Sequence, residues 1–502
     1  MSEDLRTVSL ARGSIVTFGG AVANSALAFV MTGIVGNRLG TASTGLFFQA
    51  TAVFAIVASL LPLGADTALV RGLSREQALG RAHALVPTTV AALLPVMALS
   101  LVAALAMRAT APQLAAVLNP DSAEATEEVI ATLALFLPAA PLLGVALGGS
   151  RGLGSVYPYT ALQNIAVPAG RVLAIALATA WTLGLHDVVV GWAVPLALAA
   201  AVAIPVFLVL LRRASASGPP SGVPFWQQTR AVAGPFWAFA LPRGGTTLIE
   251  RVYEWTDVLL VIALAGPEAG GVYGVVTRCA TAGVVIENAA RIVTGPRISS
   301  ALAKGDLVEA RSLFADVTRV LVLSSWPLFW VLIVFGAPVL GLFGEGFEEG
   351  APALAAVSVA MMGVAASGML QSFLLMGGRS HWQLVNRLVK LSTLVLGCLV
   401  LVPRIGILGA ALSWVAALCV DTALAGNQVF RRMGISSSPR LVALPVAVAS
   451  VVWGLGALAV RAAMGPTLAA VGAALVLCGA VYVAICYRWR ARLGIAAFLE
   501  HR

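Results

Sequence analysis

The sequence predicts an all-α polytopic membrane protein with about 14 transmembrane helices, arranged as two parallel six-helix halves plus two C-terminal helices. Two observations predict this class. The chain is 59% hydrophobic and only 11% charged, whereas soluble domains carry about 25% charged residues. Its apolar runs are continuous for about 20 residues, which is the length of a helix that crosses a bilayer and is too long for the strands of a membrane barrel.

The apolar runs place the helices in order. The polar start, MSEDLRTVSLARGS, precedes the first long run and predicts an uncleaved anchor rather than a signal peptide. The seventh and eighth helices are the least apolar, because charged residues interrupt them. The predicted helices are 13–36, 46–70, 84–107, 128–149, 159–182, 188–211, 236–265, 271–295, 315–342, 352–376, 383–402, 406–430, 441–461 and 467–487.

Alternate loops differ in charge, and this difference predicts the orientation. The intervening loops hold single basic residues and many acidic ones, such as Asp121, Glu124, Asp187 and Glu345. The positive-inside rule therefore places both termini in the cytoplasm, together with the tail 488–502. The arginine-rich loops contain Arg71, Arg75 and Arg81; Arg151; Arg212, Arg213 and Arg230; Arg297, Lys304 and Arg311; Arg379; and Arg431, Arg432 and Arg440.

Weak internal similarity predicts two halves. The Ser-, Gly- and Pro-rich stretch 213–235 is the expected cytoplasmic linker between an N-terminal six-helix lobe, 1–212, and a C-terminal six-helix lobe, 236–432. ArgGly opens a helix at 12–13 and again at 243–244, and GTASTG at 40–45 and GPEAGG at 266–271 follow those helices. GGSRGLGSVYPYTALQN at 148–164 matches MGGRSHWQLVN at 376–386, in the same order. Six helices return the chain to its starting side, so the halves are parallel repeats with a site expected between them. The two additional helices, 441–487, have no counterpart.

Several function classes are disfavoured. The net charge of +10 comes from basic residues in short loops between spans and does not indicate nucleic-acid binding. Glycine-rich GGSRGLG at 148–154 lies between two spans with no strand before it, so it is not a nucleotide site. The five cysteines and four histidines form no paired spacing, so we expect no cofactor and no metal site.

A charged string, RGGTTLIERVYEWTD at 243–257, lies inside the seventh span. Glu250, Glu254 and Asp257 fall at i, i+4 and i+7, on one stripe of a helix beside Arg251. Three like charges on one stripe do not all ionise easily, which favours coupling to a proton or a cation. The alternative is a structural network with arginines. The acids assigned to ion coupling are Glu250, Glu254, Asp257, Glu287 and Asp66, although Glu287 is also spaced to pair with Arg291.

The chain resembles the polysaccharide/oligosaccharide flippase family of the multidrug/oligosaccharidyl-lipid/polysaccharide exporter superfamily. The resemblance covers most of 10–435. It rests on ARGS…NRLGTASTGLF…LGADTALVRGLS and on LFGEGFEEGAPAL…GGRSHWQLVNRLV…VPRIGILGAALSWV. It implies a transporter of the bacterial inner membrane that moves a polyprenyl-diphosphate-linked oligosaccharide to the outer leaflet by alternating access. It also implies H⁺ or Na⁺ as a possible coupling ion, and a polysaccharide polymerase or glycosyltransferases as possible partners.

A diphosphate crossing the membrane needs a polar cavity, and the guanidinium group binds phosphate through a bidentate fork. Basic side chains inside the spans are therefore the candidate substrate ligands, with two asparagines for the sugar. The alternatives are that the basic groups reach the interface or pair with acids, and that the amides hydrogen-bond between helices. The candidates are Arg171, Arg251, Arg278, Arg291, Arg387, Lys390, Arg71, Asn24 and Asn164.

Three other functions are alternatives. An ion-coupled multidrug exporter of the same fold needs an acidic cavity with few arginines, whereas basic residues reach the spans of both halves here. A lipid II-type peptidoglycan precursor flippase fits the same residues. A membrane enzyme needs a large outward loop with catalytic groups, and the loops near 108–127 and 343–351 are short, with no His or Cys.

Overall fold

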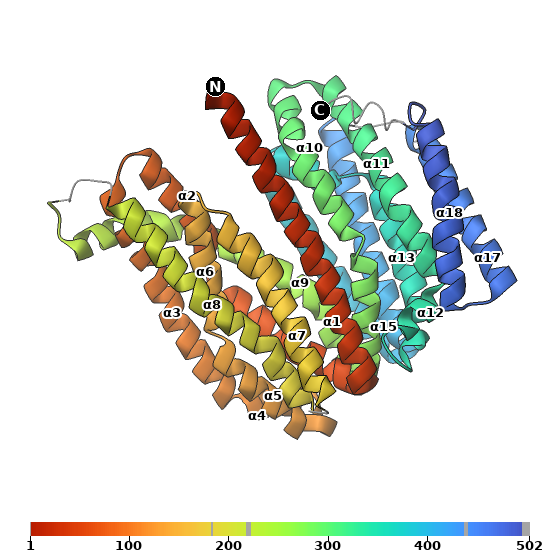
Figure 1. Ribbon diagram of the computed structural model, residues 1–502, viewed down its shortest axis with the longest axis horizontal. Helices are drawn as coiled ribbons and strands as arrows, with labels where there is room; N and C mark the ends of the chain where they lie inside the picture. The colour runs from red at the N-terminus through yellow and green to blue at the C-terminus, as the bar shows by residue number, and fades with distance from the viewer. Residues whose placement is uncertain (1, 182–183, 217–221, 436–439, 494–502) are drawn as a thin grey trace. The chain divides into compact units, whose positions relative to one another are not determined.

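The computed structural model describes residues 2–181, 184–216, 222–435 and 440–493. Helices make up the described chain, and no strand occurs in these ranges, which confirms the predicted all-α class (Figure 1). The chain divides into two compact units, Met1–Ala263 and Leu264–Arg502, which are called unit 1 and unit 2.

Eleven helical segments among the described residues are long and apolar enough to cross a membrane. Three of them, Gly19–Ala78, Phe225–Asn288 and His381–Arg432, have 60, 64 and 52 residues. A single crossing takes about 20 residues, so each is long enough to cross twice. Each also breaks at a glycine with non-helical geometry, at Gly40, Gly266 and Gly406. Counting each as two passes agrees with the expected fourteen, and the number of crossings stays a prediction.

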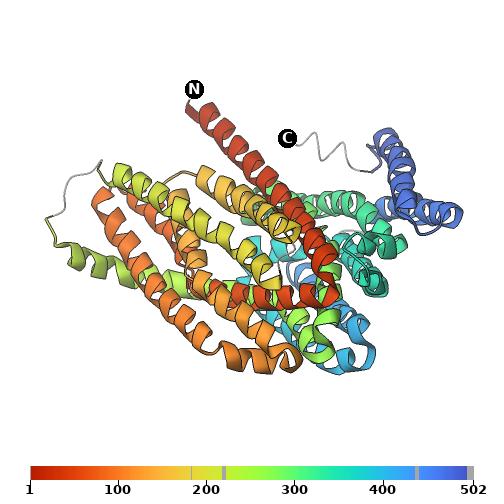
Figure 2. The ribbon, with the colours of Figure 1, turned by 60° about the horizontal axis from the view of Figure 1, so that its bottom comes forward.

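Unit 1 begins with α1 (Ser2–Leu60), whose two segments meet at Gly40 and run in different directions in Figure 2. GTASTG, which lies between the predicted helices 13–36 and 46–70, begins at this break. The remaining helices are α2 (Ala65–Ala78), η1 (Ala82–Ala84), α3 (Leu85–Ala109), α4 (Ala111–Leu118), η2 (Pro120–Ser122), α5 (Ala123–Phe136), α6 (Ala139–Gly152), η3 (Tyr159–Ala166), α7 (Val167–Ala180), α8 (Leu185–Ser215) and the first part of α9 (Phe225–Thr281).

Within unit 1, α6 is packed between α2 and α8. Glycines permit the close approach on both sides: a Cβ at Gly148 would lie 2.4 Å from the Asp66 carbonyl oxygen, and one at Gly149 would lie 2.3 Å from the Phe207 ring. These distances are too short for any side chain, so the glycines allow α2 and α8 to pack directly on the α6 backbone.

The turn between α1 and α2 contacts the first part of α9. Leu63 and Gly64 both have positive φ, at 48° and 79°. A Cβ at Gly64 would lie 2.2 Å from the Ala240 carbonyl oxygen, and one at Gly244 would lie 2.5 Å from the Leu63 carbonyl carbon. The two backbones therefore touch without intervening side chains, which fixes α9 beside α2.

Unit 2 contains the end of α9 after Gly266, followed by α10 (Val284–Lys304), α11 (Leu307–Val334), α12 (Gly336–Gly341), η4 (Phe347–Gly350), α13 (Ala351–Ser367), α14 (Leu370–Met376), α15 (Ser380–Asn427), η5 (Gln428–Arg432), α16 (Arg440–Ala449), η6 (Ser450–Leu455), α17 (Gly456–Met464) and α18 (Leu468–Arg488). Helix α11 packs against α10, α13 and α16.

The last helices of the chain join the core of unit 2. Trp453 and Tyr482 are buried in one cluster with residues of α11, and the Tyr482 hydroxyl donates a hydrogen bond of 2.8 Å to the Leu323 carbonyl. The segment predicted at 441–461 is continuous through α16, η6 and α17, and the one predicted at 467–487 is α18.

The predicted linker 213–235 is helical at both ends, because α8 continues to Ser215 and α9 begins at Phe225. Residues 217–221 lie outside the described chain. The packing of α9 on α2 places residues up to Ala263 in unit 1. The lobe boundaries expected from the sequence remain predictions.

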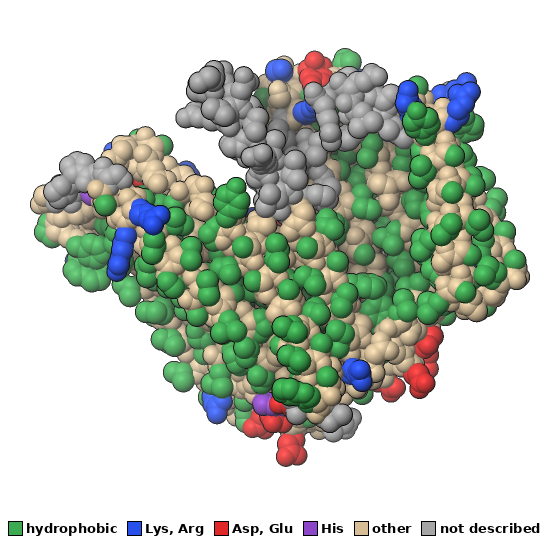
Figure 3. Space-filling model, in the orientation of Figure 1, with side chains coloured by type: hydrophobic (Ala, Val, Ile, Leu, Met, Phe, Trp, Pro, Cys, Tyr) green, Lys and Arg blue, Asp and Glu red, His purple; other side chains and the backbone are tan. Residues whose placement is uncertain are grey.

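The surface has the distribution expected of a membrane protein. On the face shown in Figure 3, hydrophobic side chains cover the flanks of the helices, and charged side chains gather at helix ends. Exposed apolar residues such as Leu105, Leu198 and Val476 are 70%, 61% and 70% accessible. Large apolar patches of this kind are stable only where a lipid or a partner covers them.

Candidate functional site

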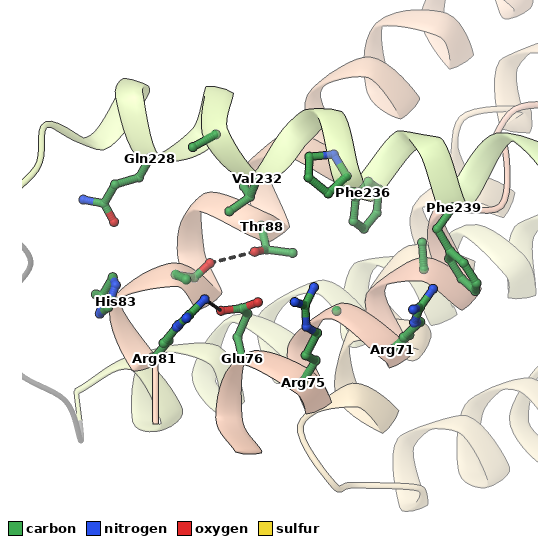
Figure 4. Close-up of a pocket in the computed structure, with 15 residues that line it drawn as sticks. Arg71, Arg75, Glu76, Arg81, His83, Thr88, Gln228, Val232, Phe236 and Phe239 are labelled. Atoms are coloured by element: carbon green, nitrogen blue, oxygen red, sulfur yellow. Dashed lines mark hydrogen bonds and ion pairs between the residues drawn. The ribbon is translucent and has the colours of Figure 1, made fainter. Parts of the chain in front are cut away.

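A cavity of about 580 Å³ lies in unit 1, between the C-terminal half of α2, the start of α3 and the first turns of α9. Figure 4 shows Arg71 and Arg75 extending from α2 toward α9, while Phe236 and Phe239 come from α9 on the opposite side. The full lining is Ala68, Arg71, Gly72, Arg75, Glu76, Arg81, His83, Ala84, Thr88, Gln228, Ala231, Val232, Pro235, Phe236 and Phe239. It is called the α2–α9 cavity below.

The cavity has an excess of positive charge. Arg71, Arg75 and Arg81 line it, and Glu76 is the one acidic residue in the lining. Glu76 lies 4.0 Å from Arg81. The guanidinium of Arg71 stacks on the Phe239 ring, 4.3 Å from its centroid. Such stacking leaves the edge of the guanidinium available for hydrogen bonds, so the cavity presents cationic donors next to an aromatic wall.

Local contacts fix the two walls. Gly80, with φ of 67°, turns the chain between α2 and η1, and Thr88 donates a 2.8 Å hydrogen bond to the Ala84 carbonyl in the first turn of α3. The Trp237 indole donates to the Ala91 carbonyl at 3.1 Å and joins α9 to α3. Phe236 and Phe239 are thereby held over α2.

The charged stripe lies further along α9. Arg251 pairs with Glu254 at 2.6 Å, and the two side chains are 49% and 54% exposed. Asp257 is 4% exposed, and its carboxylate accepts a 2.8 Å hydrogen bond from the Val258 amide. Glu250 is half-buried. The predicted stripe therefore divides into an exposed ion pair and a buried acid.

Arg171 is the remaining basic candidate in the spans of unit 1. Its Nε donates to the Trp192 carbonyl at 3.0 Å, and its guanidinium lies 3.9 Å from the centroid of the Trp192 ring. Trp192 belongs to α8, so these contacts join α7 to α8. A phosphate-binding role for Arg171 would compete with both contacts.

Unit 2 contains a second group of charges. Lys390 lies 3.9 Å from Asp421, with side chains 16% and 14% exposed, and Asp421 also accepts a 2.9 Å hydrogen bond from Gln371. Arg387 and Glu287 interact electrostatically with Lys390. Most of the basic candidates of unit 2 are thus near acids.

Glu287 and Arg291 form the pair that their helix spacing offered as an alternative, with charged atoms 3.2 Å apart. The other candidates lie on different helices. Asp66 opens α2 beside α6, Arg278 is half-buried near the end of α9, Asn164 is 8% exposed in η3, and Asn24 is exposed on α1.

Two kinds of residue in the α2–α9 cavity were not recognised from the sequence. The sequence places Arg75 and Arg81 among the basic residues of the cytoplasmic loops, and it singles out neither His83 nor the two phenylalanines. About 150 residues separate the two walls along the chain. The arginine spacing Arg71, Arg75 at i, i+4 was the one available signal, since it places both on one helix face.

Solved structures show the same fold at low sequence identity. A lipid II flippase MurJ in an inward closed conformation aligns with a TM-score of 0.72 and 10% identity, covering 96% of this chain and 99% of that one. An inward-facing multidrug resistance MATE family transporter of the MOP superfamily aligns with a TM-score of 0.64 and 14% identity, covering 85% of this chain and 100% of that one. A MOP superfamily transporter from Pyrococcus furiosus aligns with a TM-score of 0.56 and 16% identity, covering 85% of this chain and 95% of that one.

No curated protein is similar enough in sequence to match the chain. The family model described as "Polysaccharide biosynthesis protein" matches residues 10–302, which is more than half of the chain. This match agrees with the resemblance seen in the sequence, and the transporter fold agrees with it independently. The chain therefore belongs to the polysaccharide biosynthesis protein family, on the fold of the multidrug/oligosaccharidyl-lipid/polysaccharide exporter superfamily.

Proposed function

We propose that this protein is a flippase that translocates a polyprenyl-diphosphate-linked oligosaccharide, a precursor of a cell-surface polysaccharide, across the bacterial inner membrane by alternating access. It acts as a transporter and not as an enzyme. The family match and the fold support transport of this general kind. The substrate is argued from the charges.

One observation carries the proposal. Arg251 and Glu254 are about half exposed inside the segment Phe225–Asn288, which is long and apolar enough to cross a membrane. A charge facing lipid at this depth costs about 2.5–3.5 kcal/mol on insertion scales. An exposed ion pair inside a span is therefore best explained by a hydrated pathway, and Arg251 is positioned to meet an anionic group that moves along it.

The alternatives differ in which charges bind the substrate. A cation exporter would use the acids, and Glu254 is already paired with Arg251. A lipid II-type flippase would use the same arginines for the same diphosphate, so it differs only in the sugar. Basic side chains inside the predicted spans, such as Arg171, Arg251 and Arg278, favour an anionic substrate over an organic cation.

The test is flipping of a fluorescent polyprenyl-diphosphate sugar in proteoliposomes, compared with uptake of an organic-cation drug. Wild type, Arg251→Ala and Arg404→Ala are measured at matched protein levels. Arg404 is exposed at the break of α15 and serves as the control arginine. We expect Arg251→Ala to lose flipping by at least about tenfold, because a charge-assisted phosphate contact contributes about 1.5–3 kcal/mol.

Normal flipping by Arg251→Ala would show that Arg251 does not bind the substrate during transport. Drug uptake without flipping of the anionic lipid would make the protein a multidrug exporter and assign binding to the acids. Equal flipping of a peptidoglycan precursor and of other lipid-linked sugars would leave the diphosphate, rather than the glycan, as the recognised group.

A further inference from the structure

We propose that the α2–α9 cavity is a binding site for the phosphate headgroup of an amphiphile, separate from the charged stripe at Arg251. The charge, the apolar wall and the size of the cavity each support this chemistry. The site itself is argued from unit 1 alone, whereas a polyprenyl-linked ligand as its occupant rests on the proposed function.

The charge of the lining matches a phosphate ligand. Three arginines face one glutamate, which leaves an excess of two positive charges. A diphosphate diester carries two negative charges. Among the described residues, none makes a hydrogen bond or ion pair with the Arg75 side chain, which is directed into the cavity beside Phe236 (Figure 4). Its planar fork of donors is suited to phosphate oxygens.

The opposite wall predicts an apolar continuation of the ligand. Val232, Pro235, Phe236 and Phe239 of α9 face the arginines of α2. A soluble anion would gain nothing from this wall, whereas the first carbons of a lipid chain would bury apolar surface against it, at about 25 cal/mol per Å².

The size limits what enters. At about 580 Å³, the cavity lies within the range of about 300–1,000 Å³ that small-molecule sites span. It is large enough for a headgroup and the start of a chain. The positive-inside rule assigns this end of α2 to the cytoplasm, where both a newly made lipid-linked sugar and the anionic lipids of the inner leaflet are present.

A substitution at Gly72 can fill the cavity. It lies on α2 among the lining residues, and a Cβ there would lie 3.4 Å from Thr88 and 3.9 Å from Phe236, which is ordinary contact distance. A larger side chain at this position projects into the cavity without displacing the backbone. Gly144, on α6, has nothing within 4 Å of its Cβ position and is the matched control.

The experiment measures equilibrium binding of radiolabelled polyprenyl diphosphate to the full-length protein in nanodiscs of neutral phosphatidylcholine. The test variants are Arg75→Gln and Gly72→Leu. The controls are Arg230→Gln, an exposed arginine at the same end of α9 that does not line the cavity, and Gly144→Leu. We expect the Kd to rise about tenfold in both test variants and to stay unchanged in both controls.

Competitors identify the source of the phosphate. Displacement by phosphatidylglycerol vesicles would assign the site to an inner-leaflet lipid, and resistance to it would assign the site to the diphosphate carrier; both support the proposal. Inorganic diphosphate that binds as tightly as the lipid would overturn it, because the apolar wall would then contribute nothing. An unchanged Kd in Arg75→Gln would also overturn it.

A loss of binding must be distinguished from misfolding and from a loss of transport. If Gly72→Leu fails to elute as a monodisperse protein, Arg75→Gln and its rescue by Arg75→Lys decide the question. Binding is measured without flipping, so lost binding in Arg75→Gln with normal binding in Arg230→Gln supports this site whatever the flipping assay shows. Normal binding in Arg75→Gln would overturn the site, and flipping that still depends on Arg251 would leave the proposed function intact.

Discussion

At the scale of single residues, the same residue type has different roles in different surroundings. Arg171 is half-buried and held by Trp192, Arg251 is half exposed and paired with Glu254, and Arg75 faces a cavity. Because both lie inside predicted spans, the sequence makes Arg171 and Arg251 equal candidates for phosphate binding. The structure separates them by their partners, which lie 21 and 3 residues away in the chain.

For Arg171 the contacts predict a role in stability. We expect Arg171→Ala to lower the free energy of unfolding by about 1–3 kcal/mol, because a cation–π contact and a charge-assisted hydrogen bond are lost together. Trp192→Leu should remove the same cation–π contact. The measurement is thermal unfolding in detergent of both single variants and the double variant.

A double-mutant cycle tests whether Arg171 and Trp192 stabilise the protein through contact with each other. If the two residues stabilise the protein through each other, the double variant is less destabilised than the sum of the singles. Additive losses would show that Arg171 acts elsewhere. Unchanged stability with lost flipping would instead support the phosphate-binding role predicted from the sequence.

At the scale of helices, the cavity depends on backbone contact between the α1–α2 turn and α9. Gly244→Ala should lower the melting temperature, because its Cβ would lie 2.5 Å from the Leu63 carbonyl carbon and 2.9 Å from the Gly64 nitrogen. Gly245 has nothing within 4 Å of its Cβ position, so Gly245→Ala should be neutral or stabilising by up to about 1 kcal/mol through helix propensity.

These neighbouring glycines form a matched pair for thermal unfolding and for binding of polyprenyl diphosphate. We expect Gly244→Ala to weaken binding as well, since it moves Phe239 relative to Arg71. Equal melting temperatures for the two variants would show that the contact does not hold α9 in place.

The helices and their breaks were largely predictable, and their contacts were not. Apolar length gives the spans, and GTASTG and GPEAGG, which lie between predicted helices, coincide with the helix breaks found at Gly40 and Gly266. The linker prediction at 213–235 rested on the same composition, yet α9 is helical from Phe225. Packing against α2 and α3 supplies stability that local composition does not encode.

The candidate site was predictable only in part, for a physical reason. The pair between Glu287 and Arg291 follows from helix spacing alone, and the structure confirms it. Contacts such as Lys390 with Asp421, or Arg71 with Phe239, join residues 31 and 168 positions apart. They depend on how helices rotate against each other, which a single sequence specifies only through the complete packing.

At the scale of the whole molecule, directional transport against a gradient requires an energy source, and a buried acid in a span is the simplest coupling group. Asp257 is 4% exposed in α9. Asparagine at this position keeps the shape and the hydrogen-bonding oxygen but can neither bind nor release a proton, and it attracts a cation less strongly. We expect Asp257→Asn to flip lipid at a rate that no longer responds to an imposed proton or sodium gradient.

The measurement is flipping in proteoliposomes with each gradient imposed separately, for wild type, Asp257→Asn and Glu127→Gln. Glu127 is an exposed acid at the start of α5 and controls for the general loss of one negative charge. A response to only one gradient in wild type would identify the ion. A gradient response that survives in Asp257→Asn would give Asp257 a structural role. The α9 backbone contact at Val258 already indicates what that role would be, namely anchoring the carboxylate within its own helix.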